Sequence, residues 1–198
     1  MKLKIIHETS YHYDQPVRGL VQSLRLTPSA HEGQRVGECA IAVSGGERGA
    51  AFRDGAGDWI EAWTVRGPVD EVTVTIAGLI ETRDTAGVLR GHRETINPLV
   101  YLRGTALTKP DAALRELALS VTGEDALDKA HKLSAAVSEA ISYVPGVTES
   151  ATTAAEALAL GQGVCQDHAH ALIACAHVLG MPARYVSGYL HSNADGTP

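Results

Sequence analysis

Roughly the first hundred residues alternate apolar and polar side chains with a period of two. Val72, Val74 and Ile76 alternate with threonines, and Leu3 and Ile5 alternate with lysines. Because successive side chains of a strand point to opposite faces, this period predicts β-strands. Short strands separated by turns predict an antiparallel, sandwich-like domain. The predicted turns are pairs that contain glycine: Gly45-Gly46, Asp54-Gly55 and Gly67-Pro68.

A helical period replaces the strand period near Lys109-Pro110-Asp111 and continues to about Val144. Pro145-Gly146 is predicted to end this helical region. Thr153-Ala154-Ala155-Glu156 has the form of a capping box, which predicts a second helix to about Leu160. The apolar stripe of the first region recurs at steps of three and four residues: Leu127, Ala130, Leu133, Val137, Ile141 and Val144.

A third helix is predicted to begin at or near Cys165 and to end before Gly180 and Pro182. The segment Arg184–Leu190 is then predicted to form a strand. The fold class is therefore α+β, with a β-rich domain over residues 1–107 and a helical domain over residues 108–198. The predicted buried stripe of the third helix is Ala169, Leu172, Ile173, Ala176 and Leu179.

Composition narrows the function classes. The 198 residues are 44% apolar and 20% charged, with a net charge of −6, which is typical of a globular domain. No run of lysine and arginine suggests a nucleic-acid binder, and no apolar run is long enough for a membrane span. The N-terminus has no apolar segment after its lysines, and the three cysteines are widely spaced. We therefore expect a cytoplasmic, reducing setting without disulfides.

The most informative chemistry lies in Gly161-Gln162-Gly163-Val164-Cys165. Glycines allow the backbone to turn tightly and to approach a substrate closely. A cysteine at a helix N-terminus meets unpaired N–H groups and a partial positive charge, which favour the thiolate and can stabilise an oxyanion. Cys39 and Cys175 are interpreted as small buried hydrophobic residues. On physical grounds alone, Cys165 is as consistent with burial as with reactivity.

The run from Gly163 to Leu190 resembles the core of the bacterial transglutaminase-like superfamily, which includes microbial cysteine proteases and relatives of peptide N-glycanase. The motifs are Gly-Val-Cys-Gln-Asp at 163–167 and Pro-Ala-Arg-Tyr-Val-Ser-Gly-Tyr at 182–189. Segments of the first half are similar to the β-rich domain that precedes this core in bacterial members: residues 7–13, 24–28 and 81–89.

The resemblance implies a papain-like Cys-His-Asp triad in which Cys165 is the nucleophile. The family's histidine lies in a His-Ala-Trp type motif on a strand that follows Tyr185–Leu190, and its aspartate lies on the next strand. Neither motif occurs before Pro198. We therefore expect the catalytic histidine and aspartate beyond Pro198, and we expect the given polypeptide to be truncated and inactive by itself.

Other residues near Cys165 have weaker claims to a catalytic role. His168 is one turn along the same helix, where a side chain is poorly aimed at the nucleophile, and His191 is too early for the family's histidine. The resemblance implies that His168 packs where the family often has an aromatic residue. Asp167 is predicted to interact favourably with the helix dipole. By analogy with papain's glutamine, Gln162 is a candidate oxyanion donor. Arg184 is expected to brace the helix or line a cleft.

No cofactor or metal site is predicted, because His168 and His170 face different ways and no acidic cluster suggests calcium. A Cys165–Cys175 redox pair is a third and weak alternative, since ten helical residues span about 15 Å, which is too far for a disulfide. The expected function of the intact protein is thiol-dependent acyl chemistry on amide bonds of a protein or peptide substrate, as a protease, an amidase or a transamidase. The alternative is a non-catalytic binding or scaffold module that retains the fold.

Overall fold

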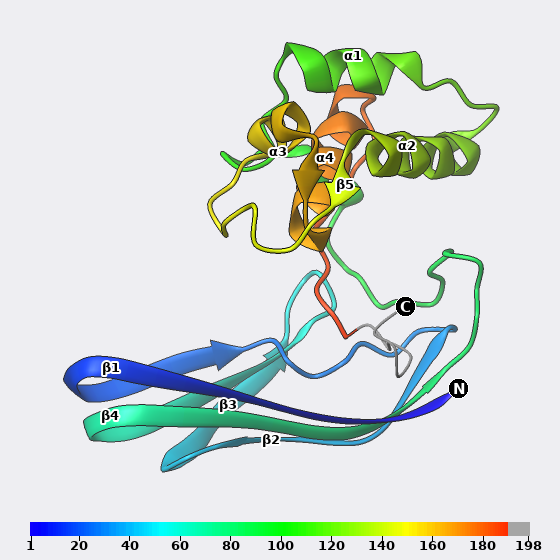
Figure 1. Ribbon diagram of the computed structural model, residues 1–198. Helices are drawn as coiled ribbons and strands as arrows, with labels where there is room; N and C mark the ends of the chain where they lie inside the picture. The colour runs from blue at the N-terminus through cyan, green and yellow to red at the C-terminus, as the bar shows by residue number, and fades with distance from the viewer. Residues whose placement is uncertain (190–198) are drawn as a thin grey trace. The chain divides into compact units, whose positions relative to one another are not determined.

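The computed structural model describes residues 1–189, and the chain divides into two compact units between Ile96 and Asn97 (Figure 1). The first unit is built from strands and the second is mainly helical, which confirms the α+β class. The domain limits of 1–107 and 108–198 stay a prediction. Leu190 and His191 lie outside the described residues.

The first unit is an antiparallel sheet in which β4 (Trp59–Thr82) is the central strand. On one side β4 pairs with β1 (Lys2–Leu24), and on the other side it pairs with β2 (Gln34–Val43) and β3 (Gly46–Arg53). The register of β1 and β4 shifts between His12 and Gly19. Both strands double back in this region (Figure 1), which brings the two halves of the sheet against one another.

Gly67-Pro68 is not the predicted turn between two strands, because it lies inside β4. Gly67 and Pro68 lie at the bend of β4, where the pairing register with β1 is irregular. The two other predicted turns are confirmed, since Gly45 separates β2 from β3 and Asp54-Gly55 separates β3 from β4. Only a glycine fits position 45 without strain, because its φ is +63°.

The period-two pattern of the first unit corresponds to burial. Val72, Val74 and Ile76 are at most 3% exposed, whereas the threonines between them are only partly buried. Val72 and Val74 pack with Trp63 and Val65 from the other half of β4. Each fully buried aliphatic side chain stabilises the fold by about 1.5–3 kcal/mol relative to an exposed one. The alternation that predicted a strand therefore corresponds to one buried and one partly buried face of β4.

In the second unit, the other helices pack around a central helix, α4 (Cys165–Val178). It is contacted by α1 (Ala112–Ser120), α2 (Ala126–Ala140) and α3 (Ala154–Leu160) (Figure 1). A 3₁₀ helix, η1 (Pro98–Leu102), precedes them. Within residues 1–189, no helix is long and apolar enough to cross a bilayer. The core residues include Leu114 from α1, Leu133 and Val137 from α2, Ala157 from α3, and Ala171, Ala174 and Cys175 from α4.

Local capping explains where three helices begin. Asp111, Asp125 and Thr153 each accept a hydrogen bond from a backbone N–H in the first turn of α1, α2 and α3. At α3 the capping box is complete, because Glu156 accepts in return from the backbone of Thr153. The start of this helix was therefore predicted correctly from its sequence.

The predicted end of α2 at Val144 is wrong, because the helix ends at Ala140. The backbone N–H groups of Ser142 and Val144 donate instead to the carbonyls of Gly161 and Gly163. These bonds belong to a short parallel ladder between β5 (Ser142–Tyr143) and β6 (Gln162–Gly163). Tertiary pairing has overridden an apolar period that continues through Ile141 and Val144.

Two predictions about the last third also need correction. Residues 184–189 form no strand: Ala183 donates its N–H to the Tyr101 carbonyl, and the described residues offer this segment no ladder partner. The predicted buried stripe of α4 is also only partly right: Ile173 and Ala176 are buried, whereas Ala169, Leu172 and Leu179 are partly buried. The helix packs against three helices, so its buried face includes other residues. Its buried residues are Asp167, His170, Ala171, Ile173, Ala174, Cys175 and Ala176.

Candidate active site

Cys165 is exposed and is the first residue of α4. The turn that places it there depends on glycine. Gly161 ends α3 in the left-handed region, at φ +66°. Gly163 is buried on β6, and a Cβ at this position would lie 2.7 Å from the Cβ and the Oδ2 of Asp167. The sequence Gly-Gln-Gly therefore carries the chain closely past α4 before the helix begins at Cys165.

Asp167 is fully buried in the first turn of α4. Its Oδ2 accepts hydrogen bonds from the Val164 backbone N–H at 2.7 Å and from the Thr148 hydroxyl at 2.6 Å. Both distances are in the short range typical of hydrogen bonds to a carboxylate. Its Oδ1 is also buried and has no hydrogen-bond partner among residues 1–189. The side chain thus makes specific bonds to the residue before Cys165, in addition to the predicted dipole interaction.

His168 contacts the carbonyl of Val164, the residue whose N–H binds Asp167. Its Nδ1 lies 2.9 Å from the Val164 carbonyl oxygen, and its Nε2 lies 2.8 Å from the Ile141 carbonyl oxygen. Carbonyl oxygens only accept hydrogen bonds, so both ring nitrogens are directed at acceptors. Neither nitrogen is placed to take a proton from Cys165. His168 is therefore a structural link between α4 and the segment before β5.

Backbone donors remain at the start of α4. The N–H groups of Asp167 and His168 donate to the Val164 carbonyl, at 2.9 and 3.2 Å. The N–H groups of Cys165 and Gln166 have no carbonyl partner within residues 1–189. Such donors at a helix N-terminus form a binding place for an anion or a developing oxyanion. Gln162, the predicted side-chain donor, lies exposed on β6.

The other two cysteines differ from Cys165. Cys175 is fully buried in α4, and its thiol lies 3.5 Å from the Leu114 carbonyl oxygen. Burial, together with the negative charge of Asp111, raises the pKa of Cys175 to about 11. Burial and the charge of Glu61 also raise the pKa of Cys39, which is partly buried on β2. All three thiols are free, and Cys165 alone among them is exposed.

Arg184 contacts Tyr101 within the second unit. Its guanidinium donates to the Tyr101 hydroxyl at 3.3 Å and lies 5.5 Å from the centre of that ring. The next residue, Tyr185, contacts the ring of His170 on α4, with centroids 5.6 Å apart. Arg184 thus contacts η1, and the role predicted for it, bracing α4 or lining a cleft, stays a prediction.

Two contacts near Cys165 were not found from the sequence. Thr148 bonds to Asp167, and the side-chain amide of Gln166 donates to the Ser150 carbonyl at 3.2 Å. Both tie the loop that follows β5 to the first turn of α4. A threonine in a polar loop carries no sequence signal of its own, so only the fold could reveal this role.

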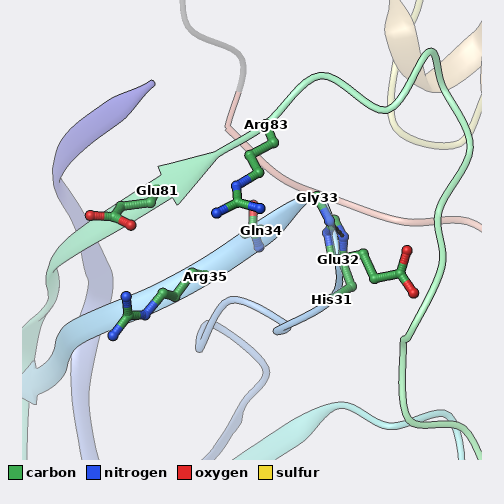
Figure 2. Close-up of a pocket in the computed structure, with 7 residues that line it drawn as sticks. All are labelled: His31, Glu32, Gly33, Gln34, Arg35, Glu81 and Arg83. Atoms are coloured by element: carbon green, nitrogen blue, oxygen red, sulfur yellow. Dashed lines mark hydrogen bonds between the residues drawn. The ribbon is translucent and has the colours of Figure 1, made fainter.

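A separate hollow of about 220 Å³ lies in the first unit, at one end of β2 (Figure 2). The polar groups that line it largely bond to other residues of the sheet unit. His31 Nδ1 accepts from the Gly33 N–H, and Glu81 pairs with Lys2 at 3.3 Å. No cysteine lines it. Within the described residues, no group of three or more potential ligands is placed to hold a metal ion. The lining residues are His31, Glu32, Gly33, Gln34, Arg35, Glu81 and Arg83.

Two known families match the chain, one in each of the two units of the structure. Residues 3–81 match the bacterial transglutaminase-like N-terminal region, and residues 115–197 match the transglutaminase-like superfamily. The first match falls within the sheet unit. The second match includes α4 with Cys165.

Similar proteins agree with these matches. An uncharacterized protein of Mycobacterium leprae is 27% identical over 208 residues, which cover 98% of this chain and 73% of the relative. An uncharacterized protein of Mycobacterium tuberculosis is 25% identical over 209 residues, and the match covers 96% of this chain and 66% of that protein. A crystal structure described as "a Putative Cysteine Protease from Cytophaga hutchinsonii" has a TM-score of 0.63 at 17% identity. It matches 92% of this chain, which spans 65% of the solved chain.

Proposed function

Because residues 115–197 match the transglutaminase-like superfamily and the chain presents an exposed cysteine at the first turn of α4, we propose that the intact protein performs thiol-dependent acyl chemistry on amide bonds. The nucleophile is Cys165. The substrate class is a protein or peptide that offers either a backbone amide or a side-chain carboxamide. The observation that carries the proposal is the position of Cys165, exposed beside the unpaired N–H groups of a helix N-terminus.

The proposed reaction has two steps. The Cys165 thiolate adds to the amide carbonyl carbon, and the oxygen takes up the negative charge close to the N–H groups of Cys165 and Gln166. The C–N bond then breaks, the leaving nitrogen takes a proton, and a thioester remains. Water or a primary amine next attacks the thioester, which releases a carboxylate or a new amide and returns the thiolate. Hydrolysis and transamidation share every step before that last attack.

The reaction also requires a group that accepts the thiol proton and donates it to the leaving nitrogen. His168 does not serve, because carbonyl oxygens face both of its ring nitrogens. The proposal therefore includes a histidine and an acidic partner that the described residues do not bring to Cys165. Three free thiols in the chain support a reducing compartment, such as the cytoplasm, for this chemistry.

The first test is alkylation of Cys165 by iodoacetamide across pH 5–9, followed by peptide mapping. N-acetylcysteine, alkylated in parallel, gives the rate of an ordinary thiol at each pH. We expect Cys165 to react about tenfold faster than the free thiol near pH 6.5, because the helix N-terminus favours the thiolate. A Cys165 that is never faster than N-acetylcysteine would contradict the proposal and favour a binding module.

The second test separates the two outcomes of the thioester. Whole protein is incubated with glutamine-containing peptides, with and without a fluorescent primary amine. Peptide-bond cleavage identifies a protease, release of ammonia alone identifies an amidase, and incorporation of the amine identifies a transamidase. The Cys165→Ala variant is the matched control for every product.

A further inference from the structure

The residue before Cys165 is held by side chains that come later in the chain. Val164 is the N-cap of α4, but its own side chain cannot accept a hydrogen bond. Asp167 binds the Val164 N–H, and His168 lies against the Val164 carbonyl. The backbone N–H and the carbonyl of Val164 are therefore both bound by side chains of the first turn of α4.

The same two side chains also reach the segment around β5. The Asp167 Oδ2 that binds Val164 also accepts from the Thr148 hydroxyl, and the far ring nitrogen of His168 faces the Ile141 carbonyl. Ser142 and Val144, between these two points, pair with the glycine turn that precedes Cys165. The nucleophile's turn is thus bonded at several points to one segment, residues 141–148.

Asp167 is an unusual residue for a purely structural cap. It is fully buried, it carries two short hydrogen bonds on a single oxygen, and its other oxygen is buried without a partner among residues 1–189. A buried acceptor without a partner costs about 1–3 kcal/mol. The same oxygen that binds the N-cap N–H also binds Thr148, so Asp167 links the first turn of α4 to the loop after β5 in addition to capping the helix.

We propose that Asp167 and Thr148 are positioning residues for Cys165. Their hydrogen bond locks the Val164 peptide, and with it the Cα of Cys165 and the free N–H groups beside it, against the loop after β5. This inference rests on the proposed function of Cys165. Its physical basis is that a reacting atom displaced by about 1 Å can lose on the order of a hundredfold in rate. Neither residue exchanges a proton or touches the acyl group.

The test uses matched substitutions at Thr148, where the hydroxyl alone can be removed. Thr148→Val keeps the shape but cannot donate to Asp167, whereas Thr148→Ser keeps the donor and loses only a methyl group. We expect Thr148→Val to slow iodoacetamide alkylation of Cys165 by about tenfold, on the scale of one lost hydrogen bond to a charged group. Thr148→Ser is expected to stay within about twofold of the parent chain, because the bond is retained.

A second measurement identifies the bond itself. Asp167→Asn keeps the size of the side chain and removes its charge. If both residues act through one hydrogen bond, the double variant Thr148→Val/Asp167→Asn alkylates no more slowly than the slower single variant. Hydrogen exchange of the Val164 amide is expected to accelerate in Asp167→Asn and in Thr148→Val, which reports the loosening independently of the thiol.

The outcomes separate this inference from the proposed function. A fast Cys165 in the parent chain with an equally fast Thr148→Val variant overturns the positioning role and leaves the nucleophile intact. A melting temperature lowered in Thr148→Val with unchanged alkylation of the folded chain also overturns the positioning role, since the bond then contributes to stability alone. A parent chain whose Cys165 reacts no faster than N-acetylcysteine overturns the proposed function, and the positioning role falls with it.

Discussion

Helix α4 carries two cysteines, one in its first turn and one in its third turn. Cys165 is exposed, follows a glycine turn and lies beside unpaired backbone N–H groups. Cys175 is fully buried among helices α1 to α4, and its pKa is raised to about 11 by burial and by the charge of Asp111. The same residue type on the same helix therefore occupies two opposite chemical environments.

This difference teaches that the fold, and not the residue type, sets the exposure and the surroundings of each thiol. At the first turn the sulfur is exposed beside backbone N–H groups that have no carbonyl partner among residues 1–189. In the buried third turn, desolvation makes a negative charge on sulfur costly. Each experiment that follows either removes one side of this contrast or tests how large it is.

Removal of Cys165 is expected to have the largest effect. In the whole protein, Cys165→Ala should lower kcat on a reactive peptide amide by at least about a thousandfold, because the covalent route is lost. Cys175→Ala should leave the rate of folded enzyme within about threefold, since this thiol has no chemical role. Steady-state kinetics on both purified variants provide the measurement. Equal losses of kcat in the two variants would show that both substitutions act by destabilising the fold and not by removing a nucleophile.

Alkylation of the native chain should differ strongly between the two thiols. With a pKa of about 11, Cys175 is only about 0.1% thiolate at pH 8, and it is also inaccessible to reagent. We expect Cys165 to react at least about a hundredfold faster than Cys175. Quantitative peptide mapping measures both sites in one sample. In concentrated urea the two rates should converge, and a ratio that persists there would point to local sequence instead of the fold.

The pH dependence of stability tests the buried side of the contrast. The pKa of Cys175 is raised from 9.0 in the unfolded chain to about 11 in the fold. Its contribution is therefore complete below pH 9, declines as pH rises from 9 to 11, and is lost above that range, by roughly 2–3 kcal/mol in total. Urea unfolding of the parent chain and of Cys175→Ala gives the difference. That difference should narrow over this range, because the buried neutral thiol then contributes less to the stability of the parent chain.

A smaller effect is expected from the turn that precedes Cys165. In Gly163→Ala the new Cβ meets the side chain of Asp167, so the first turn of α4 must shift. We expect alkylation of Cys165 to slow by about tenfold while Cys175 stays unreactive, because only the positioning is lost. Gly104→Ala is the matched control, since a Cβ there meets no atom within 4 Å. An unchanged rate in Gly163→Ala would show that the turn tolerates movement.

Patterns that depend on local physics predicted the fold well. The alternation of Val72, Val74 and Ile76 predicted a strand, which is part of β4, and the capping box predicted the start of α3. The apolar period failed at Ile141–Val144, where hydrogen bonds to the glycine turn replaced the last turn of the predicted helix. It failed again at residues 184–189, because a strand depends on a partner that local sequence does not reveal.

The candidate site was predictable to the same extent. Glycines followed by a cysteine at a helix start indicated the position of Cys165, which the structure places on the first turn of α4. The contacts of Asp167 and His168 were not predictable, because their partners Thr148 and Ile141 come from a distant segment. Side-chain pairings across a fold leave no periodic signal in the sequence.

The parallel ladder between β5 and β6 has a consequence for the timing of biosynthesis. Its two strands lie on either side of α3 in the sequence, so they can pair only after residues 142–163 have all been synthesised. A chain still leaving the ribosome therefore carries an ordinary, unaligned sulfur. The exposed position of Cys165 beside the helix N-terminus is therefore a property of the assembled helical unit, and the proposed reactivity would be acquired late.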